Sequence, residues 1–135
     1  MNETFRLHSM PHARCHILIS HDSDGVEVDL ISYKTWVCAL RYDEFVLNLY
    51  CSGRYSNTTA RHINRFTREF LKRSYYFECK DALIKDVGSA RFPGFVPVVS
   101  FTESDPEYNQ FYEQIERYEY NDFFDWNVKR YNGWY

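Results

Sequence analysis

Residues 15–51 read CHILISHDSDGVEVDLISYKTWVCALRYDEFVLNLYC, and this stretch decides the fold. An apolar run at its start is followed by the turn-forming sequence SHDSDG and then by the alternating run 26–31. Alternation of apolar and polar residues is typical of a half-buried strand, so the two runs predict a β-hairpin. Residues 35–40 and 44–51 are again rich in β-forming side chains and are joined across residues 41–43, which predicts a second hairpin.

A first helix is predicted over residues 59–72, soon after this stretch. Ile63, Phe66 and Phe70 recur there at the spacing of one apolar helix face. Three neighbouring side chains offer an oxygen that could cap the unpaired amides of the first turn: Asn57, Thr58 and Thr59.

A second helix is predicted over residues 105–120. Ser104 and Glu107 have the spacing of a capping box, and Pro106 is tolerated in the first turn, where backbone N–H groups lack partners. The apolar positions of this helix form one stripe: Tyr108, Phe111, Tyr112, Ile115 and Tyr118. Between the two helices the chain is ambiguous, except for a short strand near residues 96–101 that its proline places at a sheet edge.

These elements predict an α+β fold in a single domain over residues 1–135. An antiparallel sheet of two β-hairpins is expected to pack against the central helix and the C-terminal amphipathic helix. The aromatic content of 19% argues against disorder, because disordered chains lack such side chains. The four cysteines follow no repeated spacing, so reduced thiols and no required disulfide are expected.

The charge is unevenly distributed along the chain, although its net value is only −3. Residues 54–80 are basic, and four cations of the first helix recur at i, i+4, i+7 and i+11. We call them the basic stripe: Arg61, Arg65, Arg68 and Lys72. Such a stripe can bind phosphates or an acidic protein surface, or it can be a solvated face partly neutralised by Glu69 or by the acidic C-terminal part of the chain.

Residues 103–126 combine eight carboxylates with many aromatic side chains, and we call them the acidic aromatic segment. A folded surface with such carboxylates can imitate the phosphates of a nucleic acid, and aromatic side chains are typical interface anchors. An ordinary solvated helix face is the alternative. The candidate binding residues are Glu107, Glu113, Glu116, Glu119, Tyr120, Asp122, Phe123, Asp125 and Trp126.

Catalytic and metal-binding motifs are not recognised in the sequence. His12, Cys15, His16 and His21 are of zinc-ligand type, but their spacing matches no zinc module, and strand alternation places Cys15 and His16 on opposite faces. No glycine-rich elbow surrounds a serine, and no phosphate-binding GxxxxGK[ST] is present. We therefore expect no metal, no cofactor and no enzymatic activity.

The chain reads ISYKTWV over residues 31–37 and YSNTTARHINRF over residues 55–66. These two short patterns resemble a family of small phage and mobile-element proteins. The family shares S-Y-x-T-x-V, a hairpin, and Y-S-x-T-T-x-[RK]-H, and it has no settled activity, so the resemblance implies phage origin rather than a mechanism. The pattern positions in this chain are Tyr33, Thr35, Tyr55, Ser56, Thr58, Thr59 and His62.

Small size, a phage-type sequence pattern, polarised charge and the lack of a catalytic motif are together typical of a host-interaction protein. The leading hypothesis is a non-enzymatic inhibitor of a bacterial defence nuclease, similar to an anti-CRISPR protein, which blocks a nucleic-acid channel of a CRISPR-associated nuclease complex. The alternative is a nucleic-acid-binding regulatory protein that uses helix 59–72, and a third class is a small hydrolase or metal protein built on the N-terminal His and Cys residues. Because no signal peptide or membrane-spanning run is found, the cytoplasm of the bacterial host is the expected location, without a membrane partner. The oligomeric state is left open.

Overall fold

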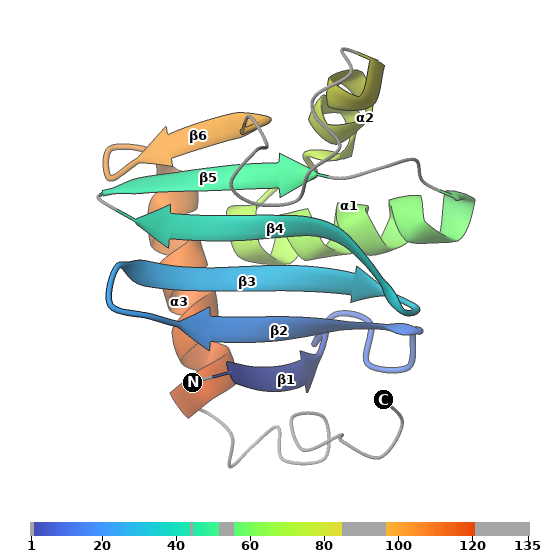
Figure 1. Ribbon diagram of the computed structural model, residues 1–135, viewed down its shortest axis with the longest axis horizontal. Helices are drawn as coiled ribbons and strands as arrows, with labels where there is room; N and C mark the ends of the chain where they lie inside the picture. The colour runs from blue at the N-terminus through green and yellow to red at the C-terminus, as the bar shows by residue number, and fades with distance from the viewer. Residues whose placement is uncertain (1, 44, 52–55, 85–96, 121–135) are drawn as a thin grey trace.

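The computed structural model describes residues 2–43, 45–51, 56–84 and 97–120. These residues form a six-stranded antiparallel sheet, whose strands lie side by side in chain order, and three helices (Figure 1). The strands are β1 (Asn2–Arg6), β2 (Cys15–His21), β3 (Gly25–Ser32), β4 (Thr35–Asp43), β5 (Val46–Cys51) and β6 (Val99–Thr102). The helices are α1 (Asn57–Leu71), α2 (Tyr76–Ile84) and α3 (Pro106–Tyr120). The predicted α+β fold with an antiparallel sheet is confirmed.

Both predicted hairpins are present, and the sheet is larger than they are. β2 pairs with β3, and β4 pairs with β5. The turn expected over residues 41–43 is wrong, because Arg41 and Tyr42 pair with Asn48 and Leu47 and the strand continues to Asp43. β6 forms one edge, as its proline-flanked sequence predicted, and β1, which was not predicted, forms the other.

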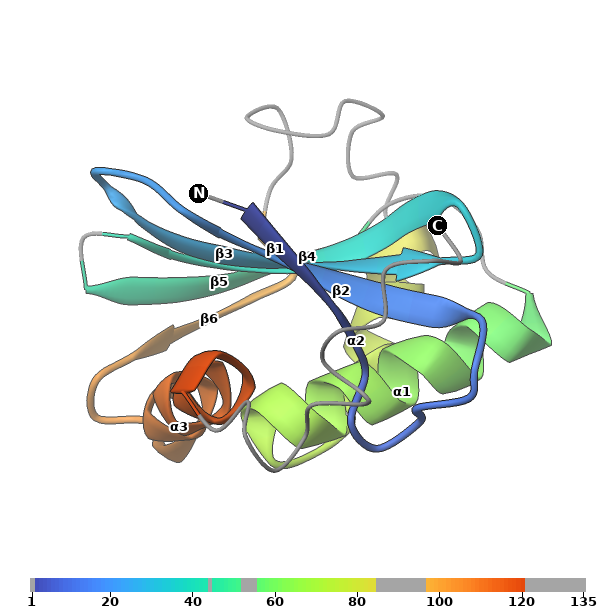
Figure 2. The same cartoon turned by 90° about the horizontal axis from the view of Figure 1, so that it is seen from below.

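One face of the sheet is covered by α1 and α3 (Figure 2). α1 runs along the strands and α3 crosses them (Figure 1). Alternate strand residues point to this side, and Ile17, Leu30 and Leu49 are fully buried there. Phe70 of α1 stacks on Tyr118 of α3, with ring centroids 5.5 Å apart, so the two helices share one aromatic core with the sheet.

The predicted apolar face of α1 is confirmed, whereas its predicted cap is wrong. Ile63, Phe66 and Phe70 are all fully buried. Ser56 is the N-cap: its backbone is extended, and its Oγ accepts from the Thr59 N–H at 3.1 Å. A hydroxyl in this position satisfies one of the amides that the first turn leaves without a backbone partner.

In α3 the apolar stripe is confirmed and the capping box is wrong. The Glu107 carboxylate does not return to the helix start but accepts from the Tyr75 hydroxyl at 2.6 Å. Asp105, immediately before the helix, accepts from the Thr102 N–H at 2.8 Å and thereby ties β6 to α3. The Ser104 hydroxyl instead bonds to that of Thr102.

The expectation of four reduced thiols is wrong for one pair of cysteines. A disulfide joins Cys51, the last residue of β5, to Cys79 of α2, with Cα atoms 5.8 Å apart. The sequence did not indicate this pair, because it forms only when α2 packs at the end of β5. Cys15 and Cys38 are free and buried, and burial raises the pKa of Cys15 to about 12.

In the described part of the chain, no helix has the length and apolar character needed to cross a membrane.

Candidate functional site

A chain of hydrogen bonds, buried except at its Ser56 end, joins the β3–β4 turn to the start of α1. The Ser32 hydroxyl lies 2.8 Å from Nδ1 of His62 and 3.0 Å from Oγ1 of Thr59. Ser56 donates to the same Thr59 oxygen at 3.2 Å. All four residues belong to the S-Y-x-T-x-V and Y-S-x-T-T-x-[RK]-H patterns. These four pattern residues therefore serve to connect the sheet to the helix.

The Ser32–His62 pair has the hydrogen bond of a nucleophile and its base, but not the accessibility. Both residues are only 2% exposed, so a substrate has no open route to the Ser32 oxygen. Burial, with a smaller contribution from the positive charge of Arg61, lowers the pKa of His62 below its usual 6.5. The imidazole is therefore neutral near pH 7 and serves as a hydrogen-bond partner in the core.

The same turn presents an exposed aromatic ring. Tyr33 follows Ser32 in a two-residue turn, is 48% exposed and has a φ of 58°. In this left-handed region the backbone conformation of a residue with a Cβ costs about 1 kcal/mol, whereas glycine adopts it freely. Its N–H donates to the Arg14 carbonyl at 2.7 Å, and its ring centroid lies 6.0 Å from that of His62. The turn is thus held over the start of α1.

Three cations of the basic stripe lie on the solvent side of α1, whereas Lys72, predicted as its last residue, follows the helix end at Leu71 with a left-handed φ of 73°. All are exposed, and none forms an ion pair with a carboxylate in the described part of the chain. Arg68 Nε donates to Asn64 Oδ1 at 3.1 Å. Glu69 points to the other side of the helix, where it accepts from the Tyr118 hydroxyl and from the Ser9 N–H. The alternative that Glu69 neutralises the stripe is therefore wrong.

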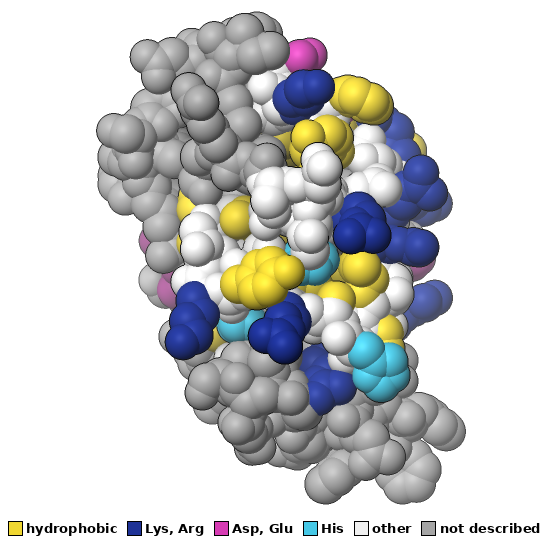
Figure 3. All heavy atoms as spheres, turned by 90° about the vertical axis from the view of Figure 1, so that its right-hand side faces the viewer, with side chains coloured by type: hydrophobic (Ala, Val, Ile, Leu, Met, Phe, Trp, Pro, Cys, Tyr) yellow, Lys and Arg dark blue, Asp and Glu magenta, His cyan; other side chains and the backbone are white. Residues whose placement is uncertain are grey.

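Further cations lie at the turn that is held over the start of α1, and Figure 3 shows one side of the molecule. Lys and Arg side chains gather there among hydrophobic and His side chains, and acidic side chains are sparse in this view. Lys34 belongs to the Tyr33 turn and Arg14 lies beside it, and both residues are exposed. We define the basic face by its cations: Arg14, Lys34, Arg61, Arg65, Arg68 and Lys72.

A hollow of about 440 Å³ lies at the basic face between α1 and α2. Its lining includes Arg61, Asn64, Arg68, Tyr76 and Phe77. The Phe77 ring is 71% exposed, which is unusual for so large an apolar side chain. The neighbouring Arg73 is already engaged, because it lies 3.7 Å from the Tyr75 ring centroid and 2.7 Å from the Glu78 carboxylate. Phe77 was not predicted as a functional residue, because the residues around it show no clear apolar period.

The acidic aromatic segment is described in part. Five of its candidate residues belong to α3: Glu107, Glu113, Glu116, Glu119 and Tyr120. Four others lie outside the described residues: Asp122, Phe123, Asp125 and Trp126. Glu113 and Glu116 are exposed, as the helix period predicted, and Tyr120 is 74% exposed. Glu119 instead lies 2.7 Å from Nε2 of His21.

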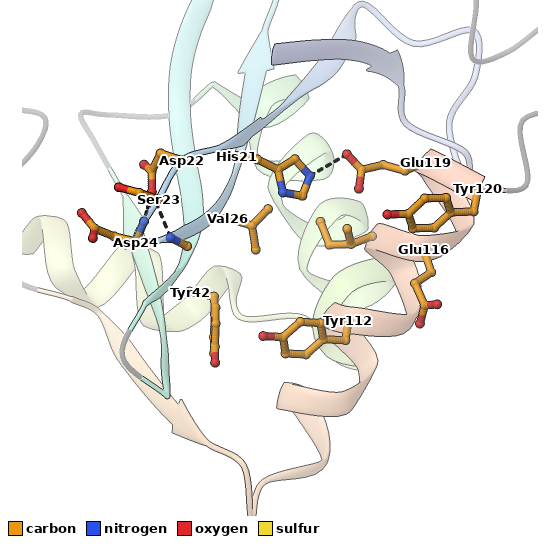
Figure 4. A pocket seen from close by; sticks show the side chains of 12 residues that line it. His21, Asp22, Ser23, Asp24, Val26, Tyr42, Tyr112, Glu116, Glu119 and Tyr120 are labelled. Atoms are coloured by element: carbon orange, nitrogen blue, oxygen red, sulfur yellow. Dashed lines mark hydrogen bonds and ion pairs between the residues drawn. The ribbon is translucent and has the colours of Figure 1, made fainter. Parts of the chain in front are cut away.

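A groove of about 540 Å³ separates α3 from the β2–β3 turn (Figure 4). Asp22 and Asp24 line it from the turn, and Tyr112 and Tyr120 line it from the helix. Hydrogen bonds from Arg41 and from the Asp24 N–H lower the pKa of Asp22 to about 2. The sequence suggested only a turn role for the two aspartates, because they are far from α3 along the chain.

The carboxylates near this groove divide between internal partners and solvent. Asp22 binds Arg41 at 2.9 Å, and Glu119 accepts from His21. The Glu116 carboxylate points away from the strands (Figure 4). Asp22 is thus ion-paired within the molecule, whereas Glu113 and Glu116 are exposed, as the cations of the basic stripe are.

The N-terminal residues of zinc-ligand type are not brought together. Cys15 faces the helices, whereas His16 points to the opposite side of the sheet, as strand alternation predicted. His12 is exposed before β2, and His21 is paired with Glu119. Burial lowers the pKa of His16 to about 4. Across the described ranges, no three His, Cys, Asp or Glu side chains form a group that could hold a metal ion.

This arrangement defines a class of small α+β proteins. A six-stranded antiparallel sheet, with its strands in chain order, is covered by helices on one face, and the basic face lies at one side. Residues 9–83, more than half of the chain, match the model of a family described as a family of unknown function, DUF8033. The chain belongs to this family. No curated protein and no solved structure matches the chain significantly. The matched residues contain the whole basic face and exclude α3.

Proposed function

We propose that this protein is a non-enzymatic nucleic-acid-binding protein whose basic face contacts phosphates. One observation carries the proposal: the stripe cations are exposed, with no ion-paired carboxylate among the described residues. Two arginines elsewhere behave differently, because Arg41 and Arg73 lie within 2.9 Å and 2.7 Å of carboxylates. The stripe therefore gathers exposed positive charge along one side of α1 and its C-terminal end.

Local charge matters more than the net charge of −3 for this kind of binding. At about 0.1 M salt, charges more than about 10 Å apart are largely screened from each other. Phosphates that meet the basic face release condensed counterions, which supplies a favourable free energy of binding. Arg61 lies in the first turns of α1, where the helix dipole disfavours a cation, so its position is better suited to binding an anion than to stabilising the helix.

The family match supports the same face. The residues that it covers, 9–83, extend from before Arg14 to beyond Phe77, whereas α3 begins only at Pro106. A function that members of the family share is therefore expected to use the basic face rather than the acidic aromatic segment.

The test is the salt dependence of binding to fluorescent DNA and RNA oligonucleotides, followed by anisotropy. The double variant Arg65→Ala/Arg68→Ala should bind more weakly than the parent, and its log–log salt slope should be shallower by about 0.7–0.9 for each lost phosphate contact. Arg117→Ala is the matched control, because Arg117 is an exposed arginine of α3 outside the basic face. If the parent binds no nucleic acid at about 50 mM salt, the proposal is wrong.

A second candidate function is inhibition of a bacterial defence nuclease by protein–protein binding, in the manner of an anti-CRISPR protein. The observation that favours it is the exposure of Glu113, Glu116 and Tyr120 on one helix beside a groove. Carboxylates steer association with a basic nucleic-acid channel, and an exposed tyrosine can anchor the complex. In that case α3, and not the basic face, makes the contact.

A further inference from the structure

We propose that the nucleic acid bound by the basic face is single-stranded, and that Tyr33 and Phe77 stack on its bases; this inference rests on the proposed function. The two residues are exposed by 48% and 71%, and both accompany the cations of the basic face. Proteins that bind single strands combine a positively charged track for the backbone with aromatic platforms for successive bases.

Tyr33 is held outward by the fold rather than left on a loose loop. Its turn is fixed on one side by the N–H bond to the Arg14 carbonyl and on the other by the buried Ser32–His62 hydrogen bond. Arg14 and Lys34, which accompany this ring, are both exposed. The ring is thus a rigid platform next to two charges that can meet the phosphates of the same nucleotides.

Phe77 offers the second platform, at the hollow between α1 and α2. Arg61 and Arg68 line this hollow opposite Phe77, so a base lying on the ring would place its phosphate within reach of guanidinium groups. The nearby Tyr75 ring is already covered by Arg73 and is not available for stacking. Phe77 therefore differs from its neighbour in being presented to solvent.

The exposed rings favour a single strand over a duplex. In a duplex the base faces are stacked on one another, and only phosphates, sugars and groove edges are accessible. In a single strand the faces are open and can stack on aromatic side chains without sequence preference. From Arg61 to Arg68 the stripe rises about 10 Å along α1, and Lys72 follows at the helix end, which suits a short run of nucleotides.

The experiment compares a pyrimidine single strand of about 15 nucleotides with the corresponding duplex, using anisotropy. The parent should bind the single strand more tightly. Tyr33→Gly should weaken single-strand binding about tenfold, and so should Phe77→Ala, while duplex binding changes less than about twofold. Glycine at position 33 suits the positive φ and keeps the backbone N–H, so this variant should remain at least as stable as the parent. Tyr120→Ala, which removes an exposed ring of α3, is the matched control and should bind like the parent.

The outcomes separate this inference from the proposed function. If both aromatic variants bind the single strand as the parent does, while Arg65→Ala/Arg68→Ala still binds weakly, stacking is wrong and phosphate binding stands. Tighter binding of the duplex would likewise overturn the single-strand assignment alone. If neither form of DNA or RNA binds the parent at about 50 mM salt, both are wrong.

Discussion

Ser32 and His62 meet across 30 residues of sequence, and their hydrogen bond shows how a few side chains position the basic face. The bond fixes the turn that carries Tyr33 above the helix that carries Arg61. Thr59 and Ser56 extend the same chain to the helix cap. A change at His62 is therefore expected to affect both the fold and the binding face.

The stability of the protein is expected to depend on pH through His62. Its folded pKa is lowered below 6.5 by burial, so its contribution to stability is present above about pH 6.5 and is lost as the pH falls through the folded pKa. We expect the difference in unfolding free energy between the parent and His62→Asn to shrink between about pH 7.5 and pH 5 in urea titrations. His16, whose pKa is also lowered, is present in both proteins and cancels. A difference that stays constant with pH would contradict this role.

Sequence patterns identified the residues of this junction better than their roles. Ser56 and Thr59 were both recognised, but three adjacent residues with capping oxygens were preferred over Ser56 as the cap. The choice depends on the extended backbone at position 56, which sequence spacing does not reveal. Tyr33 was noted as a pattern residue, but its exposure follows from its place in a two-residue turn, where it has a positive φ that a tyrosine rarely adopts.

At the scale of elements, α1 owes its place to the apolar face that contacts the sheet and α3. Phe66 is fully buried, so Phe66→Ala should lower the unfolding free energy by about 3–5 kcal/mol in denaturant titrations. Phe77→Ala, which truncates an exposed ring of α2, should cost less than about 0.5 kcal/mol and serves as the control. Equal costs for the two variants would mean that the apolar face of α1 is not the core.

The elements that the sequence did not predict are those whose stability comes from neighbours. β1 has only five residues, and its Phe5 packs edge-on against Tyr118 of the distant α3, with ring centroids 5.5 Å apart. α2 has no clear apolar period, and the disulfide of Cys79 with Cys51 attaches it to β5. Such contacts are made only in the folded chain, whereas α1 and α3 carry their own period and were predicted nearly to the residue.

Across the whole molecule, the unequal charge of the sequence is organised by folding into two different surfaces. The basic residues of the central region gather on one side with few acidic neighbours (Figure 3). Glu119 and Glu107 of α3 bond to His21 and Tyr75, the nearby Asp22 is ion-paired with Arg41, and Glu113 and Glu116 are exposed. Counting charges along the chain predicted the separation, but not these contacts, because the partners come from other elements. The reason to prefer the basic face as the binding site is that the family match covers it and does not reach α3.

Charge reversal on α3 tests the competing function at the scale of the whole molecule. Glu113→Lys/Glu116→Lys changes two exposed residues and leaves both the apolar stripe and the Glu119–His21 pair intact, so stability should change by less than about 1 kcal/mol. If α3 docks in the basic channel of a host defence nuclease, the variant should associate about tenfold more slowly and inhibit less.

Inhibition would be measured as the loss of nuclease activity on a DNA target, and association by surface plasmon resonance. Glu3→Lys, at an exposed position of β1, is the control for a change of charge elsewhere. A doubly reversed protein that inhibits the nuclease as well as the parent would exclude α3 as the contact, whereas normal nucleic-acid binding by the same protein would agree with the basic face as the binding site.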